Sequence, residues 1–275
     1  MTMTQETDAF AAWLGLREPA DAAARAVELL EPVRRRLADG ERTVVHDLGT
    51  GTGSMGRWLA PLLPGPQHWV LYDRDPGLLR RARAGMPEVA ADGAPVTVET
   101  RQRDITRLTA DDLDGAGLVT ASALLDMLTA DEVERFVAAC AGAGCPTLLT
   151  ISVIGRVRLD PPDPLDARIE AAFNAHQRRT VDGQRLLGPD AADATVTAFG
   201  GHGIDVRVRS SPWRLGADRA ELIAEWFEGW VGAACEQEPE LTGPAAAYAG
   251  RRLAEAASGR LGVVVEHNDL LANCE

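Results

Sequence analysis

The fold is decided by the stretch Val44-Val45-His46-Asp47-Leu48-Gly49-Thr50-Gly51-Thr52-Gly53. Its apolar first half predicts a short buried strand, and its second half places a glycine at every second position. Alternating glycines let the backbone turn sharply and let a ligand lie against bare main chain, because no Cβ is in the way. Ser54 and the apolar spacing after it predict a helix directly behind the turn. The free N–H groups and the helix dipole there favour a nucleotide-type cofactor.

Strands and helices alternate over the first half of the chain. The apolar runs predict strands at about 43–48, 68–73, 95–100, 117–123 and 146–153. Helices are predicted at about 54–63, 76–85 and 130–141, whereas residues 105–113 are ambiguous. Apolar strands separated by helices are typical of a parallel sheet that is covered on both faces. The fold class is therefore α/β, with a doubly wound sheet.

Helical patterns dominate the two ends of the chain. An amphipathic helix is predicted over Asp21–Leu37, behind a separate short helix or arm near Trp13–Pro19. Later helices are predicted at about 163–179, 190–199, 217–236 and 243–258, with strands at Ile204–Arg209 and Leu261–Glu266. Because no linker-like run divides the chain, we expect one domain with additions. Its parts are a helical arm or lid (1–40), a cofactor-binding core (41–155), and cap helices with a closing hairpin (156–275).

Composition and charge exclude several classes of function. The 275 residues carry a net charge of −13, which argues against wrapping of nucleic acid. All 28 basic residues are arginine, so no Walker lysine, Schiff-base lysine or lysine base exists. No apolar run approaches the roughly 20 residues that cross a bilayer, and the N-terminus lacks a signal-peptide pattern. The four cysteines show no metal-binding spacing, so we expect a cytoplasmic protein without a metal; a homo-oligomer stays open.

Two kinds of cofactor fit the glycine turn. Gly51–Gly56 matches the GxGxxG fingerprint of dinucleotide-binding proteins. The overlapping pattern Asp47-x-Gly49-x-Gly51-x-Gly53 is similar to the first motif of class I S-adenosylmethionine (SAM) methyltransferases. Asp73 ends the second predicted strand, 20 residues beyond Gly53, where its carboxylate would accept both ribose hydroxyls of either cofactor. Asp73 therefore does not distinguish SAM from a dinucleotide cofactor.

Three other features favour SAM over NAD. Asp47 lies inside a strand, where a charge needs a partner, and SAM carries an ammonium group that NAD lacks. Asp104 follows the third strand, where it would accept a hydrogen bond from an adenine amino group. About 40 residues precede the first strand, whereas dinucleotide domains often begin close to it.

Taken together, these segments resemble the class I SAM-dependent methyltransferases. The glycine turn, Asp73, Asp104 and Leu118–Asp126 match, in order, the family's glycine loop, ribose acid, adenine contact and fourth-strand motif beside the methyl group. The resemblance covers about residues 40–155 and implies a Rossmann-like sheet of seven strands, the last antiparallel. It implies that cofactor is bound by Asp47, Gly49, Gly51, Gly53, Asp73, Asp104, Ile105 and Ala121. The roughly 50-residue helical insertion between the two closing strands departs from the family, and we interpret it as a substrate cap.

The residues on the acceptor side are predicted from a polar helix after the fifth strand. His176 is the candidate catalytic residue, as acceptor ligand or base, because the pKa of histidine lies near neutrality. Asn174 and Arg178 share a neighbouring stripe of that helix, and Trp213 is placed to wall an apolar acceptor. The competing interpretation of the polar helix is an ordinary solvent-exposed helix. The competing interpretation of Trp213 is packing in the core.

The sequence therefore predicts a SAM-dependent methyltransferase that acts on a small organic acceptor, with S-adenosylhomocysteine (SAH) as product. Nucleic acid and membranes are not expected as partners. Two alternatives stay open at this point. One is an NAD(P)-dependent oxidoreductase, and the other is a SAM-binding protein without methylation activity.

Overall fold

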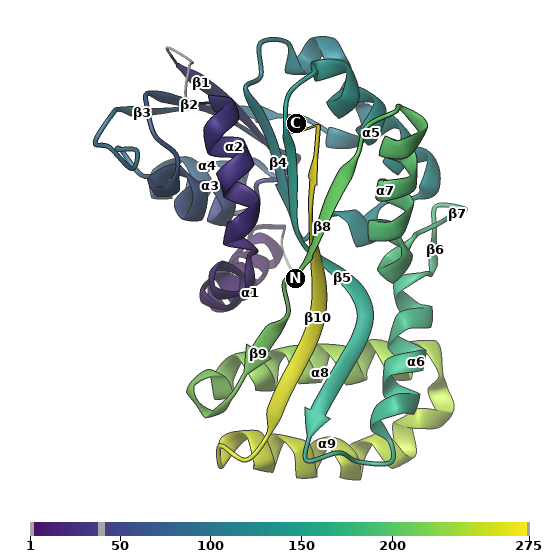
Figure 1. The fold of residues 1–275 in the computed structure, drawn as a ribbon. Helices are drawn as coiled ribbons and strands as arrows, with labels where there is room; N and C mark the ends of the chain where they lie inside the picture. The colour runs from purple at the N-terminus through teal and green to yellow at the C-terminus, as the bar shows by residue number, and fades with distance from the viewer. Residues whose placement is uncertain (1–2, 38–41, 274–275) are drawn as a thin grey trace.

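A computed structural model describes residues 3–37 and 42–273. At its centre lies one eight-stranded sheet with the strand order β3-β2-β1-β4-β5-β10-β8, and β9 pairs with the other end of β10 (Figure 1). The strands are β1 (Thr43–Leu48), β2 (Gln67–Asp73), β3 (Val96–Gln102), β4 (Leu118–Ser122), β5 (Thr147–Asp160), β8 (Val206–Ser210), β9 (Trp213–Leu215) and β10 (Gly262–Ala272). A separate small hairpin joins β6 (Thr180–Val181) to β7 (Gln184–Arg185).

Helices cover both faces of the sheet. They are α1 (Met3–Ala24), α2 (Leu30–Leu37), α3 (Ser54–Leu59), α4 (Pro76–Gly85), α5 (Ala130–Ala143), α6 (Asp166–Gln177), α7 (Ala191–Gly201), α8 (Ala220–Gln237) and α9 (Thr242–Ala257). One buried cluster joins Trp69 and Leu71 of β2 to α2, α3 and α4. A second joins Val70 and Tyr72, the alternate residues of the same strand, to α5 and α7. Since successive strand residues point to opposite faces, the sheet is covered on both sides.

The pairing confirms the predicted doubly wound sheet. The four pairs among β1 to β5 are parallel, and β10 runs antiparallel between β5 and β8. An antiparallel last strand inserted at this place is what the family resemblance implies. No helix among the described residues has both the length and the hydrophobicity needed to span a membrane.

Two strands run far beyond the sheet core. β5 and β10 stay paired from Thr147–Ala272 to Asp160–Gly262, so they form a ribbon that reaches α8 and α9 (Figure 1). Helices α6, α8 and α9 pack on this ribbon around their own buried aromatic cluster. Both strands are longer than predicted, and the expected domain boundary at residue 155 falls inside β5. The boundary expected at residue 40 lies outside the described residues.

The predicted closing hairpin is wrong in its pairing. β8 pairs with Asn268–Ala272 of β10, whereas Val263–Val265 pairs with β9. The polar run Glu266 to Asp269 resembles a turn in the sequence. In the fold it stays inside the strand, because the carboxylate of Asp269 is buried and accepts hydrogen bonds from other segments.

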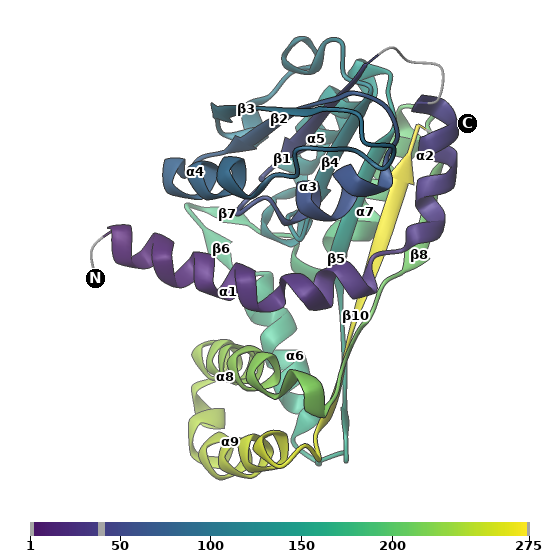
Figure 2. The same cartoon turned by 90° about the vertical axis from the view of Figure 1, so that its left-hand side faces the viewer.

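The helix predicted over Asp21–Leu37 is also wrong. The chain forms one long helix, α1, which ends at Ala24, then a 3-10 turn (Val27–Leu29) and then α2. The break follows from a long-range contact, because the N–H of Ala26 donates to Asp269 at 2.8 Å instead of to a helical carbonyl. Figure 2 shows α1 lying across the molecule, between the sheet core and α8. The ambiguous stretch 105–113 contains two short 3-10 helices, Ile105–Arg107 and Ala110–Leu113.

Candidate cofactor and acceptor site

The glycine turn adopts the conformation that its sequence requires. Gly49, Gly51 and Gly53 have φ values of 69°, 56° and 88°, a region that side chains with a Cβ rarely adopt. A Cβ on Gly53 would lie 3.0 Å from the Cα of Ala82 in α4, and one on Gly51 would lie 3.1 Å from Leu14. The turn therefore lies between α4 and α1, with bare backbone on its surface.

Asp47 places a half-paired carboxylate beside this turn. The residue is only 1% exposed, and its Oδ1 accepts a hydrogen bond of 2.7 Å from Thr120. Its Oδ2 is buried and makes no hydrogen bond of standard geometry among the described residues, although the hydroxyl of Thr50 also acts on this carboxyl. Burial raises the pKa of the Asp47 carboxyl above its usual range. A cationic ligand group at the turn would satisfy the free oxygen, so the site fits the ammonium group of SAM.

Asp73 ends β2 at the same edge of the sheet. Its Oδ2 accepts from the N–H of Gly51 and its Oδ1 from the N–H of Asp75, both at 2.9 Å. Burial is the main cause that raises the pKa of the Asp73 carboxyl. Asp75 caps α4 by accepting from Gly77 and Leu78, as its position before a proline predicts. The carboxylate of Asp73 is thus fixed to the glycine turn itself.

The other predicted cofactor residues occupy different environments. Asp104 accepts from the backbone and the hydroxyl of Thr106, so it caps the first 3-10 helix after β3. These hydrogen bonds lower the pKa of the Asp104 carboxyl. Ile105 packs against the core cluster under α5, and Ala121 is buried inside β4.

Arg25 is a residue of this site that the sequence analysis missed. It is 3% exposed, follows α1 directly, and lies 5.0 Å from the ring of Trp58. Its guanidinium contacts the hydroxyls of Ser54, Ser122 and Thr150, all at 3.1–3.4 Å. Burial lowers its pKa, although carboxylates including Asp47 oppose that shift. In the sequence, Arg25 lies inside the helix predicted over Asp21–Leu37. No local pattern there distinguishes it from an arginine on an ordinary helix surface.

Helix α1 is tied to the core on both sides of the glycine turn. Glu18 forms a two-pronged ion pair with Arg57 of α3, and Thr7 donates to Asp75 at 2.7 Å. Arg81 of α4 pairs with Asp8. A groove of about 930 Å³ opens between the first half of α1 and α4, next to Asp75 and Gln102. The turn thus lies under α1, and the groove opens at the ends of β2 and β3, where adenosine is expected.

The predicted acceptor residues on α6 point to three different neighbours. Asn174 donates to the carbonyl of Gly155 in β5 at 2.7 Å. His176 lies 3.1 Å from the carboxylate of Glu236 on α8, a side chain that is 74% exposed. Arg178 forms a two-pronged ion pair with Asp190, with both bonds at 2.6 Å. Arg178 also donates to the carbonyl of Asn174 at 3.1 Å, but the side chains of the three residues contact different segments.

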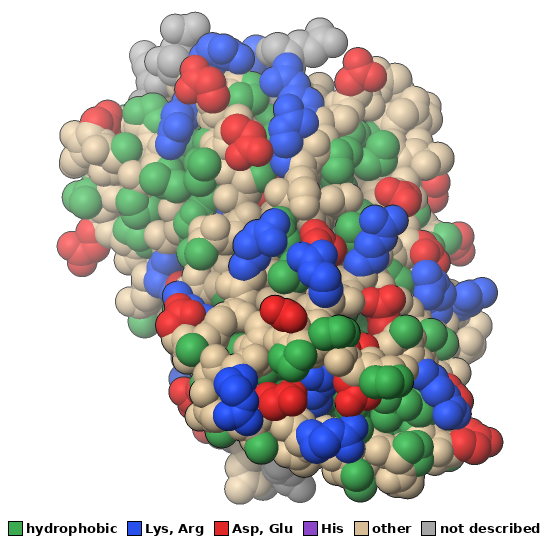
Figure 3. Space-filling view, turned by 60° about the horizontal axis from the view of Figure 1, so that its bottom comes forward, with side chains coloured by type: hydrophobic (Ala, Val, Ile, Leu, Met, Phe, Trp, Pro, Cys, Tyr) green, Lys and Arg blue, Asp and Glu red, His purple; other side chains and the backbone are tan. Residues whose placement is uncertain are grey.

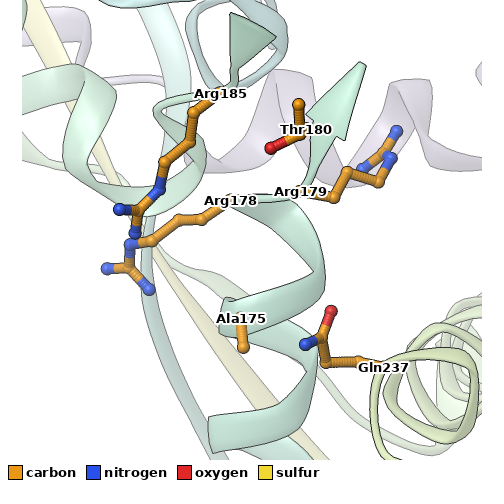
Figure 4. A pocket seen from close by; sticks show the side chains of 6 residues that line it. All are labelled: Ala175, Arg178, Arg179, Thr180, Arg185 and Gln237. Carbon is orange, nitrogen blue, oxygen red and sulfur yellow. The ribbon is translucent and has the colours of Figure 1, made fainter. Parts of the chain in front are cut away.

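A cavity of about 690 Å³ opens at the end of α6. It is lined by Ala175, Arg178, Arg179, Thr180, Arg185 and Gln237 (Figure 4). In Figure 4 the side chains of Arg178 and Arg185 extend to one side of α6, whereas Arg179 extends to the other. Arg178 and Arg179 also donate to carbonyls of the last turn of α6. That contact is the usual one for arginines at a helix C-terminus.

Trp213 lies in the buried interface between β9 and α1. It is 3% exposed, donates to Asp21 at 2.9 Å, and lies against the guanidinium of Arg17. His267 also packs against Trp213, and burial lowers the pKa of His267 to about 3. Trp213 therefore packs under α1 within the cluster of the ribbon helices.

Comparison with known proteins finds one matching family model and several similar solved structures. Residues 45–145 match the model of a methyltransferase domain family. The cyclopropane synthase MmaA2 from Mycobacterium tuberculosis is 14% identical, with a TM-score of 0.49 over 90% of this chain and 82% of that one. Magnesium protoporphyrin IX methyltransferase from Synechocystis, solved with bound SAH, is 15% identical, with a TM-score of 0.39 over 77% and 82% of the two chains. No curated protein matches the sequence.

The family match coincides with the part of the chain that builds the site. It begins in β1 and ends directly before β5, so it spans the glycine turn, Asp73 and the end of β4. The antiparallel last strand is what the resemblance to class I methyltransferases implies. Residues 45–145, which make up less than half of the chain, are therefore similar to a methyltransferase domain family.

Proposed function

We propose that this protein transfers the methyl group of SAM to a small organic acceptor between α1, the sheet edge and the ribbon helices. The observation that carries the proposal is the buried, unpaired oxygen of Asp47 beside the bare glycine turn. A buried carboxylate oxygen without a donor is costly unless a ligand supplies one. The ammonium group of SAM supplies that donor at the place where the turn admits the ligand.

Each cofactor contact has a residue of fitting chemistry. Asp73 would accept from the ribose hydroxyls, and Asp104 with Ile105 would border the adenine. Arg25 would pair with the carboxylate of the methionine part, because its present contacts are all long and include no ion pair among the described residues. When bound, SAM supplies an electrophilic methyl group. The chain holds the cofactor in place and excludes water with α1.

Binding of SAH and of NADH to the wild-type protein tests the proposed function. We expect calorimetry to show a one-to-one heat of binding with SAH and no binding with NADH. The physical reason is that the glycine turn is flanked by the carboxylate of Asp47, which repels a pyrophosphate and attracts an ammonium. Binding of NADH without binding of SAH would favour an oxidoreductase. Binding of SAH without transfer to any acceptor would favour the alternative of a SAM-binding protein.

Replacement of Arg25 tests the methionine end of the site separately. We expect Arg25→Gln to weaken SAH binding about tenfold, since one charge-assisted hydrogen-bonded contact is lost. The matched ligand is 5′-methylthioadenosine, which has the same adenosine and sulfur but lacks the amino acid. Its affinity should be the same for the variant and the wild type. An equal loss for both ligands would show that Arg25 only supports the fold.

The remaining assignments are part of the proposal. The ribbon helices α8 and α9 would cap the acceptor, residues 1–40 would act as the lid, and the protein would work in the cytoplasm. His176 stays the predicted catalytic residue, with Asn174, Arg178 and Trp213 as acceptor contacts. The acceptor is proposed to be a small molecule because the charge is strongly negative. On the face in Figure 3, basic and acidic side chains are spread among apolar atoms, with no single-sign surface for a polyanion.

A further inference from the structure

A polar pair joins Asp126, the last residue of the fourth-strand motif, to Gln177 at the end of α6. The side-chain amide nitrogen of Gln177, at the end of α6, is 3.5 Å from Oδ2 of Asp126. The amide oxygen of Gln177 is buried and has no hydrogen-bond partner among the described residues. The reverse amide orientation would set two oxygens against each other, so the carboxylate fixes the orientation seen. One buried oxygen is thereby left without a donor.

The pair is close to the place of methyl transfer. Leu124 contacts the glycine turn, since a Cβ on Gly49 would lie 3.0 Å from its Cδ1. Asp126 follows two residues later, in a short 3-10 helix (Leu125–Met127). Parallel strands of an open α/β sheet bind their ligands at this carboxyl edge. Asp126 therefore lies at the acceptor end of the proposed cofactor site.

Asp126 has charged neighbours but no ion pair. The guanidinium groups of Arg17 in α1 and Arg179 after α6 are the charges that act on it, and neither forms a salt bridge with it in the described part of the chain. Burial is the dominant influence and raises the pKa of the Asp126 carboxyl. Asp126 as a whole residue is of intermediate exposure, although its carboxyl group is largely buried.

The carboxylate of Asp126 and the amide oxygen of Gln177 are both acceptors, and the amide oxygen is the one that is buried without a donor. Buried acceptors without donors are rare in folded proteins, and those that occur near a site indicate a ligand. A hydroxyl group offers one hydrogen, whereas an amino nitrogen offers two from a single atom. The amino nitrogen is the donor that serves both residues.

We propose that Asp126 and Gln177 bind the amino nitrogen of a primary-amine acceptor and that Asp126 takes up its proton. This inference rests on the proposed methyl transfer. The lone pair of the neutral amine forms the new bond to the methyl carbon. The carbon–sulfur bond breaks, and its electron pair stays on the sulfur of SAH. The proton that the new secondary ammonium gives up passes to the carboxylate of Asp126, so charge and atoms balance.

The first test is an NMR titration with methylammonium chloride as the probe and tetramethylammonium chloride as the control. Both ions carry one positive charge, but only methylammonium has N–H donors. We expect methylammonium to shift the side-chain amide signal of Gln177 in ¹⁵N-labelled protein, with SAH present and absent. The signal is assigned by its loss in Gln177→Leu. A ligand of two heavy atoms binds at best with a Kd of about 10 mM, so titration extends to about 100 mM.

Variants of Asp126 decide how the result is interpreted. In Asp126→Asn the shift with methylammonium should weaken at least about tenfold, because a charged acceptor is lost. The same variant should raise Tm by about 2–4 °C, because a buried charge without an ion pair is removed. The matched control is Asp163→Asn, at the start of α6, whose carboxylate accepts from Leu165 and pairs with Arg251. This control should lower Tm and leave the methylammonium shift unchanged.

Each other outcome contradicts the proposal. Equal shifts with the two cations would show a response to charge alone, and no shift with either would show that no amine binds. A lower Tm for Asp126→Asn would assign that carboxylate a structural role. If the wild-type protein does not bind SAH, the proposed function is overturned instead. The methylammonium result would still decide whether the amine site exists.

Discussion

Asp73→Ala should weaken the binding of SAH about 100-fold, as measured by calorimetry. The wild-type carboxylate ends β2 and is fixed by the N–H groups of Gly51 and Asp75. It is therefore oriented in advance for the two ribose hydroxyls. Loss of two hydrogen bonds to a charged acceptor costs about 3 kcal/mol, which corresponds to roughly 100-fold in affinity.

Two controls separate this effect from damage to the fold. Asp92→Ala removes an exposed carboxylate that accepts from Gly65 in a distant turn, and it should leave SAH binding unchanged. Asp73→Asn keeps the shape and one acceptor oxygen, so its loss of affinity should be smaller than that of the alanine variant. Affinity within about twofold of the wild type in Asp73→Ala would show that the ribose is held elsewhere.

Asp269→Leu should lower the free energy of unfolding by about 3–5 kcal/mol, as measured by urea denaturation. The side chain is 1% exposed and accepts from the N–H of Ala26, the N–H of Ile151 and the hydroxyl of Ser211, at 2.6–2.8 Å. These donors come from the N-terminal arm, β5 and the segment before β9. Leucine fills a similar volume but leaves three buried donors without an acceptor.

The matched variant for this position is Asp269→Asn. Asparagine retains one acceptor oxygen, so we expect a loss between the wild type and the leucine variant. Asp269 accepts from the N–H of Ala26, the residue next to Arg25. We therefore expect the folded leucine variant to bind SAH more weakly than the folded wild type. A loss below about 1 kcal/mol would show that the arm is held by its helix contacts instead.

The core of the fold was predictable because its determinants are local. The glycine turn and the cap at Asp75 act on residues next to them in the chain, and α4 begins and ends as predicted. Ser54, expected as an N-cap, is instead the first residue of α3, and its hydroxyl accepts from Arg25. The apolar strands β1, β2 and β4 were recognisable because they are buried on both faces of a parallel sheet, whereas the edge strand β3 is only partly buried. The same local rules found Asp47 and Asp73, whose positions follow from where their strands end.

The errors arose where distant segments decide the structure. The break after α1 depends on Asp269, which is 243 residues away from Ala26. The extension of β5 and β10 depends on their pairing with each other, and each alone resembles a strand followed by a loop. Arg25 was missed for the same reason, since its polar neighbours lie on α3, β4 and β5.

A crystal structure of the protein grown with SAH tests the central claim most directly. The account predicts the amino-acid part of SAH against Gly49–Gly53, with its ammonium facing the free oxygen of Asp47 and its ribose on Asp73. Well-ordered SAH bound away from the turn, or a turn that takes the pyrophosphate of a soaked dinucleotide, would contradict the account.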